Sequence, residues 1–196
     1  MYVLDADSLK KAKITQGLII INSICFIVFN ILLPLEFILQ LVQINSKIIN
    51  DLEFYRLITS MFLHADILHI FSNMLALLLF GTAVENNYSK IEYLIIYFIS
   101  GLIGNLFSLI LLPLNVISLG ASGAIFGLIG ASFVLFMLDG DKTLIFLGIF
   151  YLFYFIIASL APGINLWAHL FGLVGGFLFG YIFTRKRKNQ DYYYNY

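Results

Sequence analysis

The sequence carries a serine and a histidine whose chemistry is that of a nucleophile and a base. Ser122 lies in a Gly-Ala-Ser-Gly turn, and two apolar segments separate it from His169 in the sequence. A serine hydroxyl is a weak nucleophile until a base takes its proton, and a neutral imidazole is the usual base. Ser122 and His169 therefore form a candidate nucleophile and general base.

Donors for a developing oxyanion can also be found. His69 and Asn73 are four residues apart, so on a helix they share one face and could both point at Ser122. The backbone N–H of Ser122 is expected near a helix N-terminus, whose positive end suits a developing negative charge. Gly120 and Gly123 flank the serine and allow close approach of a substrate backbone or a neighbouring helix.

These polar residues stand in a very apolar chain. Apolar residues make up 61% of its 196 residues and charged residues only 11%, against roughly 25% charged in a soluble domain. The formal net charge is zero, which excludes the electrostatic signature of a nucleic-acid binder. A single cysteine excludes a disulfide framework. The composition indicates a polytopic membrane protein.

Charge-free runs predict the membrane crossings. They cover 14–35, 67–84, 93–138 and 143–184. The last two are about twice the length that one helix needs, and proline-containing breaks near Pro113 and Pro162 divide them. The sequence therefore predicts an all-α membrane protein with six transmembrane helices, at 15–36, 67–86, 91–112, 121–138, 142–160 and 166–184.

The distribution of Lys and Arg predicts the orientation. Residues 1–14 and 185–196 are predicted as cytoplasmic tails of a membrane domain at 15–184, because basic residues concentrate at both ends. Of the 11 basic residues, only Lys47 and Arg56 fall on the outer side. Both lie in 37–66, which is too polar to span and is predicted as a structured interfacial loop braced by Arg56.

This topology brings the candidate residues to one depth. The second, fourth and sixth helices all begin at the outer face, and each carries polar groups in its first turns. Polar groups inside a membrane indicate a functional site by default. No acidic residue lies at a matching depth in the fourth or sixth helix, which predicts a Ser–His dyad rather than a triad.

Other interpretations remain open for the individual residues. Taken alone, Ser122 is better explained as a packing residue than as a nucleophile. For His69, Asn73 and His169, taken one at a time, an interhelical hydrogen bond explains the residue as well as a functional role does. Three histidines could also hold zinc, but the spacing of His64 and His69 suits one helical face poorly, and zinc would leave Ser122 unexplained. Glycines spaced four apart in the fourth and sixth helices predict close packing of these two helices.

The motifs and their order resemble those of the rhomboid intramembrane serine proteases. They are Tyr55-Arg56, Phe62-Leu63-His64, His69-x-x-x-Asn73-Met74, Gly81-x-x-x-Glu85, Gly120-Ala121-Ser122-Gly123 and Ala168-His169-x-x-Gly172-x-x-x-Gly176. The resemblance extends from the end of the first predicted helix through the sixth and is similar to the minimal six-helix form of the family.

The resemblance implies an intramembrane serine endopeptidase without a cofactor or metal. Ser122 would be the nucleophile, His169 the base, and Asn73, His69 and the Ser122 backbone the oxyanion hole. His64 would line the water-access side. Substrates would be single-span membrane proteins cut near the outer leaflet, in the cell or plasma membrane. The resemblance gives no oligomeric state.

Two positions depart from the family pattern. Phe126 replaces a frequent tyrosine, so stacking under His169 is expected to survive without a hydroxyl hydrogen bond, and Tyr55 replaces a tryptophan. The alternative function is a non-catalytic, derlin-type protein that binds membrane clients on the same fold. A solute channel is disfavoured, because no inverted repeat is visible.

Overall fold

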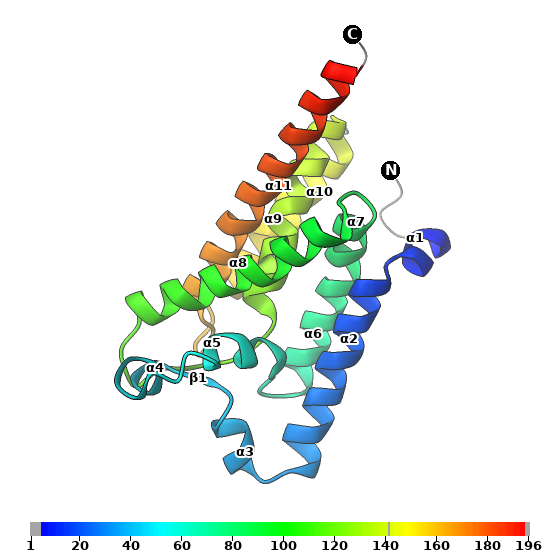
Figure 1. Cartoon of the computed structure of the whole chain (residues 1–196). Helices are drawn as coiled ribbons and strands as arrows, with labels where there is room; N and C mark the ends of the chain where they lie inside the picture. Colours follow the sequence, from blue (N-terminus) through cyan, green and yellow to red (C-terminus); the bar gives the residue numbers. More distant parts are fainter. Residues whose placement is uncertain (1–4, 141, 195–196) are drawn as a thin grey trace.

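The computed structural model describes residues 5–140 and 142–194, which are almost entirely helical apart from two short strands and the connecting turns (Figure 1). Residues 1–4 of the predicted N-terminal tail and 195–196 of the predicted C-terminal tail lie outside this range. The helices form one bundle in which α9, α10 and α11 lie together and α8 crosses them obliquely.

Four helical segments are long and apolar enough to cross a membrane. They are Lys13–Leu32, formed by α2 (Lys13–Phe26) and η1 (Ile27–Leu32); Ile67–Glu85, formed by α6 (Ile67–Ala76), η3 (Leu77–Gly81) and α7 (Thr82–Glu85); α8 (Lys90–Leu111); and the part Leu166–Arg187 of α11 (Leu166–Tyr194). Two further apolar helices are shorter, α9 (Ser122–Asp139) and α10 (Lys142–Ala158). Helices therefore occur near all six predicted ranges, and the chain is an integral membrane protein.

The last helix is longer than predicted. It was expected to end at 184, where the basic run begins, but α11 continues to Tyr194. Within the added part, the guanidinium of Arg187 pairs with Glu92 at the start of α8 and donates to the carbonyl oxygen of Asn87. Arg187 thus anchors the C-terminal part of α11 to the α7–α8 turn.

Helices α9 and α11 pack closely through glycines, as their spacing predicted. A methyl group on Gly172 would overlap the carbonyl oxygen of Gly123, and one on Gly176 would overlap that of Gly127. Only a residue without a side chain fits at these two positions of α11. The backbones of α9 and α11 therefore approach along several turns, which brings the starts of the two helices side by side.

The segment between η1 and α6 is structured. It contains α3 (Leu35–Leu39), β1 (Gln43–Ile44), α4 (Asn45–Asp51), α5 (Arg56–Thr59) and η2 (Ser60–Phe62). Strand β1 pairs antiparallel with β2 (Ile117–Ser118), which lies shortly before α9. This pairing was not predicted, and it ties the segment to the turn that leads into Ser122.

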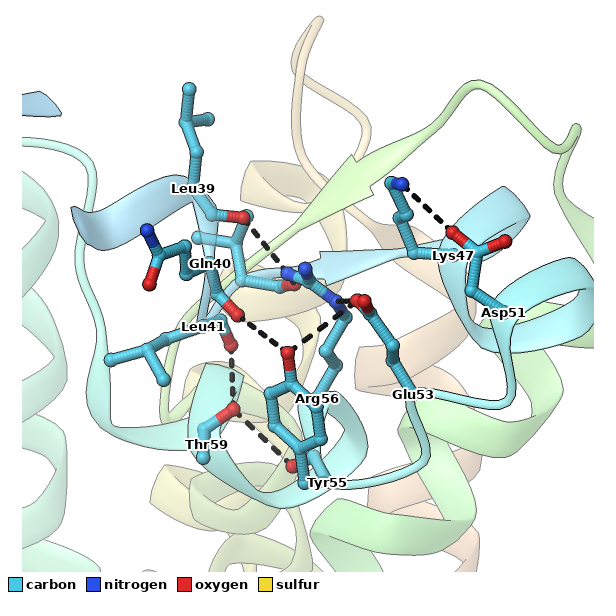
Figure 2. Close-up of polar contacts among 10 residues, drawn as sticks. Leu39, Gln40, Leu41, Lys47, Asp51, Glu53, Tyr55, Arg56 and Thr59 are labelled. Atoms are coloured by element: carbon cyan, nitrogen blue, oxygen red, sulfur yellow. Dashed lines mark hydrogen bonds and ion pairs between the residues drawn. The ribbon is translucent and has the colours of Figure 1, made fainter. Parts of the chain in front are cut away.

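Arg56 braces this segment, as predicted (Figure 2). Its side chain is 6% exposed and donates to the carbonyl oxygens of Leu39 and Val42 at 2.8 and 2.9 Å, while Nε pairs with Glu53. Nearby, Lys47 and Asp51 form an exposed pair, and the hydrogen bond to Asp51 raises the pKa of Lys47. The buried arginine, and not the exposed pair, joins the two halves of the segment.

The other end of the bundle holds the two ends of the described chain. Helix α1 (Ala6–Lys11), α7 and the C-terminal part of α11 lie opposite α3, α4 and α5 (Figure 1). Here Glu85 accepts hydrogen bonds from the backbone N–H groups of Ile14 and Thr15 at 2.8 and 2.7 Å. Glu85 thereby caps the N-terminus of α2.

Candidate active site

The turn before α9 places Ser122 at the first residue of the helix. Gly120 has φ of 131°, a conformation that side chains disfavour, and a Cβ there would lie 2.9 Å from Nε2 of His69. The N–H of Gly120 donates to the carbonyl oxygen of Ser60 at 2.9 Å. The turn is thus fixed by η2 on one side and leaves room only for glycine beside His69.

The predicted nucleophile and base are brought together. Nε2 of His169, in the first turn of α11, lies 2.7 Å from Oγ of Ser122. This hydrogen bond joins residues far apart in the sequence, and the close glycine packing of α9 and α11 makes it possible. The pair has the geometry in which an imidazole can accept a proton from a serine hydroxyl.

Phe126 lies under the base. Its ring stacks on the imidazole of His169, with centroids 4.4 Å apart and planes inclined by 11°. Phe126 is one turn after Ser122 on α9, so a single helix supplies both the hydroxyl and the surface on which the imidazole rests. The stacking expected for this departure from the family pattern is confirmed.

His69 is oriented by its own helix end. Asp66 caps α6 by accepting from the His69 N–H at 2.8 Å, and Nδ1 of the ring accepts from the N–H of Ala65 at 3.4 Å. Because a neutral imidazole carries one proton, Nε2 is then the protonated nitrogen, and it faces Gly120. His69 thus presents an N–H donor beside the Ser122 turn.

His64 and Asn73 occupy buried positions next to His69. The ring of His64 meets that of His69 edge to face at 5.0 Å, and neither of its nitrogens has a hydrogen-bond partner among the described residues. Asn73 donates to the carbonyl oxygen of His69 at 2.8 Å, and its buried Oδ1 has no hydrogen-bond partner in the part of the chain that the structure describes. Among the contacts of the described residues none joins Asn73 to Ser122, so its place in an oxyanion hole stays a prediction.

Two further polar residues hold this site and were not predicted. Oγ of Ser159, directly after α10, lies 2.6 Å from Nδ1 of His169. Asn165 accepts from the N–H of Ala168 at 3.1 Å and donates to Ser118, which joins the start of α11 to β2. Ser159 lies close to the proline break at 162, where a serine is common at the end of a helix. Nothing in its position in the sequence therefore indicates a contact with His169.

The arrangement has the parts needed for acyl transfer. A hydroxyl is hydrogen bonded to an imidazole, and an N–H donor and a helix N-terminus lie beside it. Across residues 5–140 and 142–194, no three His, Cys, Asp or Glu side chains are grouped so that they could hold a metal ion. The fold and the site define an apolar helical membrane protein with a serine–histidine pair at the start of two packed helices.

Comparison with known proteins gives the family. Residues 51–186 match the rhomboid domain. The chain is 37% identical over 147 residues to YdcA of Bacillus subtilis (strain 168), a protein with a rhomboid-protease name, covering 70% of this chain and 71% of YdcA. The chain belongs to the rhomboid family.

Other relatives are longer than the matched region. RHOMBOID-like protein 6, mitochondrial, of Arabidopsis thaliana is 38% identical over 142 residues, covering 70% of this chain and 46% of the relative. Rhomboid protease GluP of Bacillus subtilis (strain 168) is 36% identical over 138 residues, covering 68% of this chain and 27% of GluP. The chain thus spans less than half of these two relatives.

Proposed function

We propose that this protein is an intramembrane serine endopeptidase that works through the dyad of Ser122 and His169. The observation that carries the proposal is the 2.7 Å separation between Oγ of Ser122 and Nε2 of His169 inside an apolar helical bundle. Membership of the rhomboid family, with relatives that bear protease names, supports the same reaction class.

The reaction begins when Oγ of Ser122 attacks the carbonyl carbon of a peptide bond and its proton moves to Nε2 of His169. The tetrahedral intermediate carries its negative charge on the former carbonyl oxygen. When it collapses, His169 returns the proton to the leaving amine and an ester to Ser122 remains. Water, deprotonated by the same nitrogen, then releases the second product and restores the serine.

Donors around Ser122 would stabilise the oxyanion. The first N–H groups of α9 have no partners within the helix and point toward the turn. Nε2–H of His69 faces the same turn across Gly120. Asn73 completes the set if its amide turns from the carbonyl oxygen of His69 toward the substrate. One such donor contributes about 10²-fold or more to the rate.

The substrate class follows from the location of the dyad. In this proposal all six apolar helices cross the membrane, with both tails cytoplasmic and the segment 37–66 at the outer surface. Ser122 and His169 lie in the first turns of α9 and α11, near that surface. Substrates are then single-span membrane proteins cut near the outer leaflet of the cell membrane.

A cleavage assay tests the proposal against the derlin-type alternative. Purified protein in liposomes is incubated with a model single-span substrate, and fragments are compared between the native chain and Ser122→Ala. We expect fragments with the native chain and none with the variant. Fragments of equal yield from both would exclude Ser122 as nucleophile, and binding of the substrate without any cleavage would favour the client-binding function.

A further inference from the structure

The side of His169 that faces away from Ser122 contacts a second serine. Ser159 directly follows the last residue of α10, and its Oγ lies 2.6 Å from Nδ1 of His169. Its side chain is 3% exposed, so this hydrogen bond is shielded from solvent and lipid. The proposed peptide-bond cleavage uses Nε2 of His169 and does not involve Ser159, the partner of Nδ1.

Hydrogen-bond geometry assigns the protons. Oγ of Ser159 also lies 2.6 Å from the carbonyl oxygen of Phe155, one helical turn earlier. Two oxygens this close repel unless a hydrogen lies between them, and a carbonyl can only accept, so the hydroxyl hydrogen points at Phe155. Toward the imidazole, Ser159 is then an acceptor, and Nδ1 of His169 carries the proton.

This assignment decides what Nε2 can do. A neutral imidazole carries one proton, so with Nδ1 protonated Nε2 presents a lone pair to the hydroxyl of Ser122 at 2.7 Å. In the opposite tautomer Nε2 would be protonated and could not act as a base. A serine–histidine dyad has no carboxylate to hold the histidine in the Nδ1–H tautomer. Another hydrogen-bond acceptor at Nδ1 must therefore do so.

We propose that Ser159 is a positioning residue that holds His169 in the Nδ1–H tautomer and thereby keeps Nε2 available as the base. The inference rests on the proposed serine-protease function. Removing the Ser159 hydroxyl would leave a buried N–H without an acceptor, which makes the active tautomer less favourable. Loss of one such hydrogen bond corresponds to about a tenfold change in population or rate.

The tautomer can be observed directly, without any substrate. The chain has 3 histidines, so ¹⁵N-histidine labelling in detergent micelles gives few signals, and those of His169 are identified by their loss in His169→Ala. We expect long-range ¹⁵N–¹H correlations of the native chain to show the Nδ1–H form. We expect Ser159→Ala to shift the ring toward the Nε2–H form and Ser159→Thr to retain Nδ1–H. An Nε2–H ring in the native chain, or an unchanged ring in Ser159→Ala, would overturn the proposal.

Kinetics provide the second readout. We expect Ser159→Ala to lower the rate of fluorophosphonate labelling and kcat for a model single-span substrate about tenfold, with KM unchanged. Ser159→Thr should restore most of the rate, because threonine keeps the hydroxyl.

The matched control is Ser132→Ala. Ser132 is a fully buried serine of α9 that makes the same kind of bond, to the carbonyl oxygen of Leu128 at 2.8 Å, away from the histidine. Equal losses in Ser132→Ala and Ser159→Ala would indicate a structural role and overturn the proposal. If Ser122→Ala still cleaves, the proposed function fails, whereas the tautomer spectrum still decides the role of Ser159.

Discussion

At the scale of single residues, the site depends on how the ring of His169 is held. Phe126 supports one face of the ring, Ser122 bonds Nε2, and Ser159 bonds Nδ1. The first two contacts could be predicted, since Phe126 lies one turn after the serine and Ser122 lies in a recognisable motif. The third could not, because Ser159 comes from the end of another helix whose position only the packed structure reveals.

Replacing Phe126 tests the stacked ring. Phe126→Leu keeps an apolar side chain in a buried position but removes the planar surface under His169. Aromatic stacking contributes about 0.5–1.5 kcal/mol, so the rate of fluorophosphonate labelling should fall about two- to tenfold.

Phe136→Leu is the control for that substitution. Phe136 is 6% exposed on the same helix and makes no ring contact with His169 among the described residues. Its replacement should change the labelling rate little. Equal rates in Phe126→Leu and the native chain would show that the stack does not orient the base.

At the scale of elements, the contact between α9 and α11 brings the dyad together. The glycine spacing was enough to predict this contact, because small residues four apart allow helix backbones to approach in a membrane. The sequence did not indicate how the turn before α9 is fixed. Its anchors are the β1–β2 pair and the hydrogen bond from Gly120 to Ser60, which depend on contacts distant in sequence.

A methyl group at the helix contact should separate the two helices. In Gly176→Ala the added carbon would overlap the carbonyl oxygen of Gly127, so α11 must shift. We expect a loss of about 2 kcal/mol in the free energy of unfolding, measured by denaturant titration in mixed micelles, together with reduced labelling of Ser122.

Gly17→Ala is the matched control, because a methyl group there would meet nothing within 4 Å and alanine favours a helix over glycine. It should leave stability equal or raise it by about 0.5–1 kcal/mol. A Gly176→Ala variant as stable as Gly17→Ala would contradict the close approach of α9 and α11.

The segment between η1 and α6 should depend on Arg56. Arg56→Ala leaves the carbonyl oxygens of Leu39 and Val42 without this donor, which is expected to destabilise the fold by about 2 kcal/mol in the same titration. Lys47→Ala removes an exposed ion pair and should change the stability little. Equal effects of the two substitutions would show that the buried arginine does not brace the segment.

At the scale of the whole molecule, the six crossings proposed above would place both ends of the chain on one side of the membrane. In Figure 1, α1 and the end of α11 lie at the end of the bundle opposite α3 and α4. The occurrence of helices near the six predicted ranges could be expected from the charge-free runs and the prolines. The length of α11 could not be predicted, because a run of basic residues is typical of a tail. The pairing of Arg187 with Glu92 becomes apparent only in the folded structure.

Single cysteines test the orientation. In a Cys25→Ser background, which removes the one native cysteine, Asp51→Cys and Lys186→Cys are exposed to a membrane-impermeant maleimide. We expect Asp51→Cys to react in intact cells and Lys186→Cys to react only after permeabilisation. Reaction of both from the same side would contradict the six-crossing arrangement.

Covalent labelling of Ser122 by a fluorophosphonate in the membrane-embedded protein tests the proposed dyad of Ser122 and His169 most directly. We expect labelling of the native chain, mapped to Ser122 by mass spectrometry, and loss of labelling in both Ser122→Ala and His169→Ala. Ser132→Ala, which lies outside the site, should be labelled like the native chain. Labelling of another residue, or undiminished labelling of His169→Ala, would contradict the dyad.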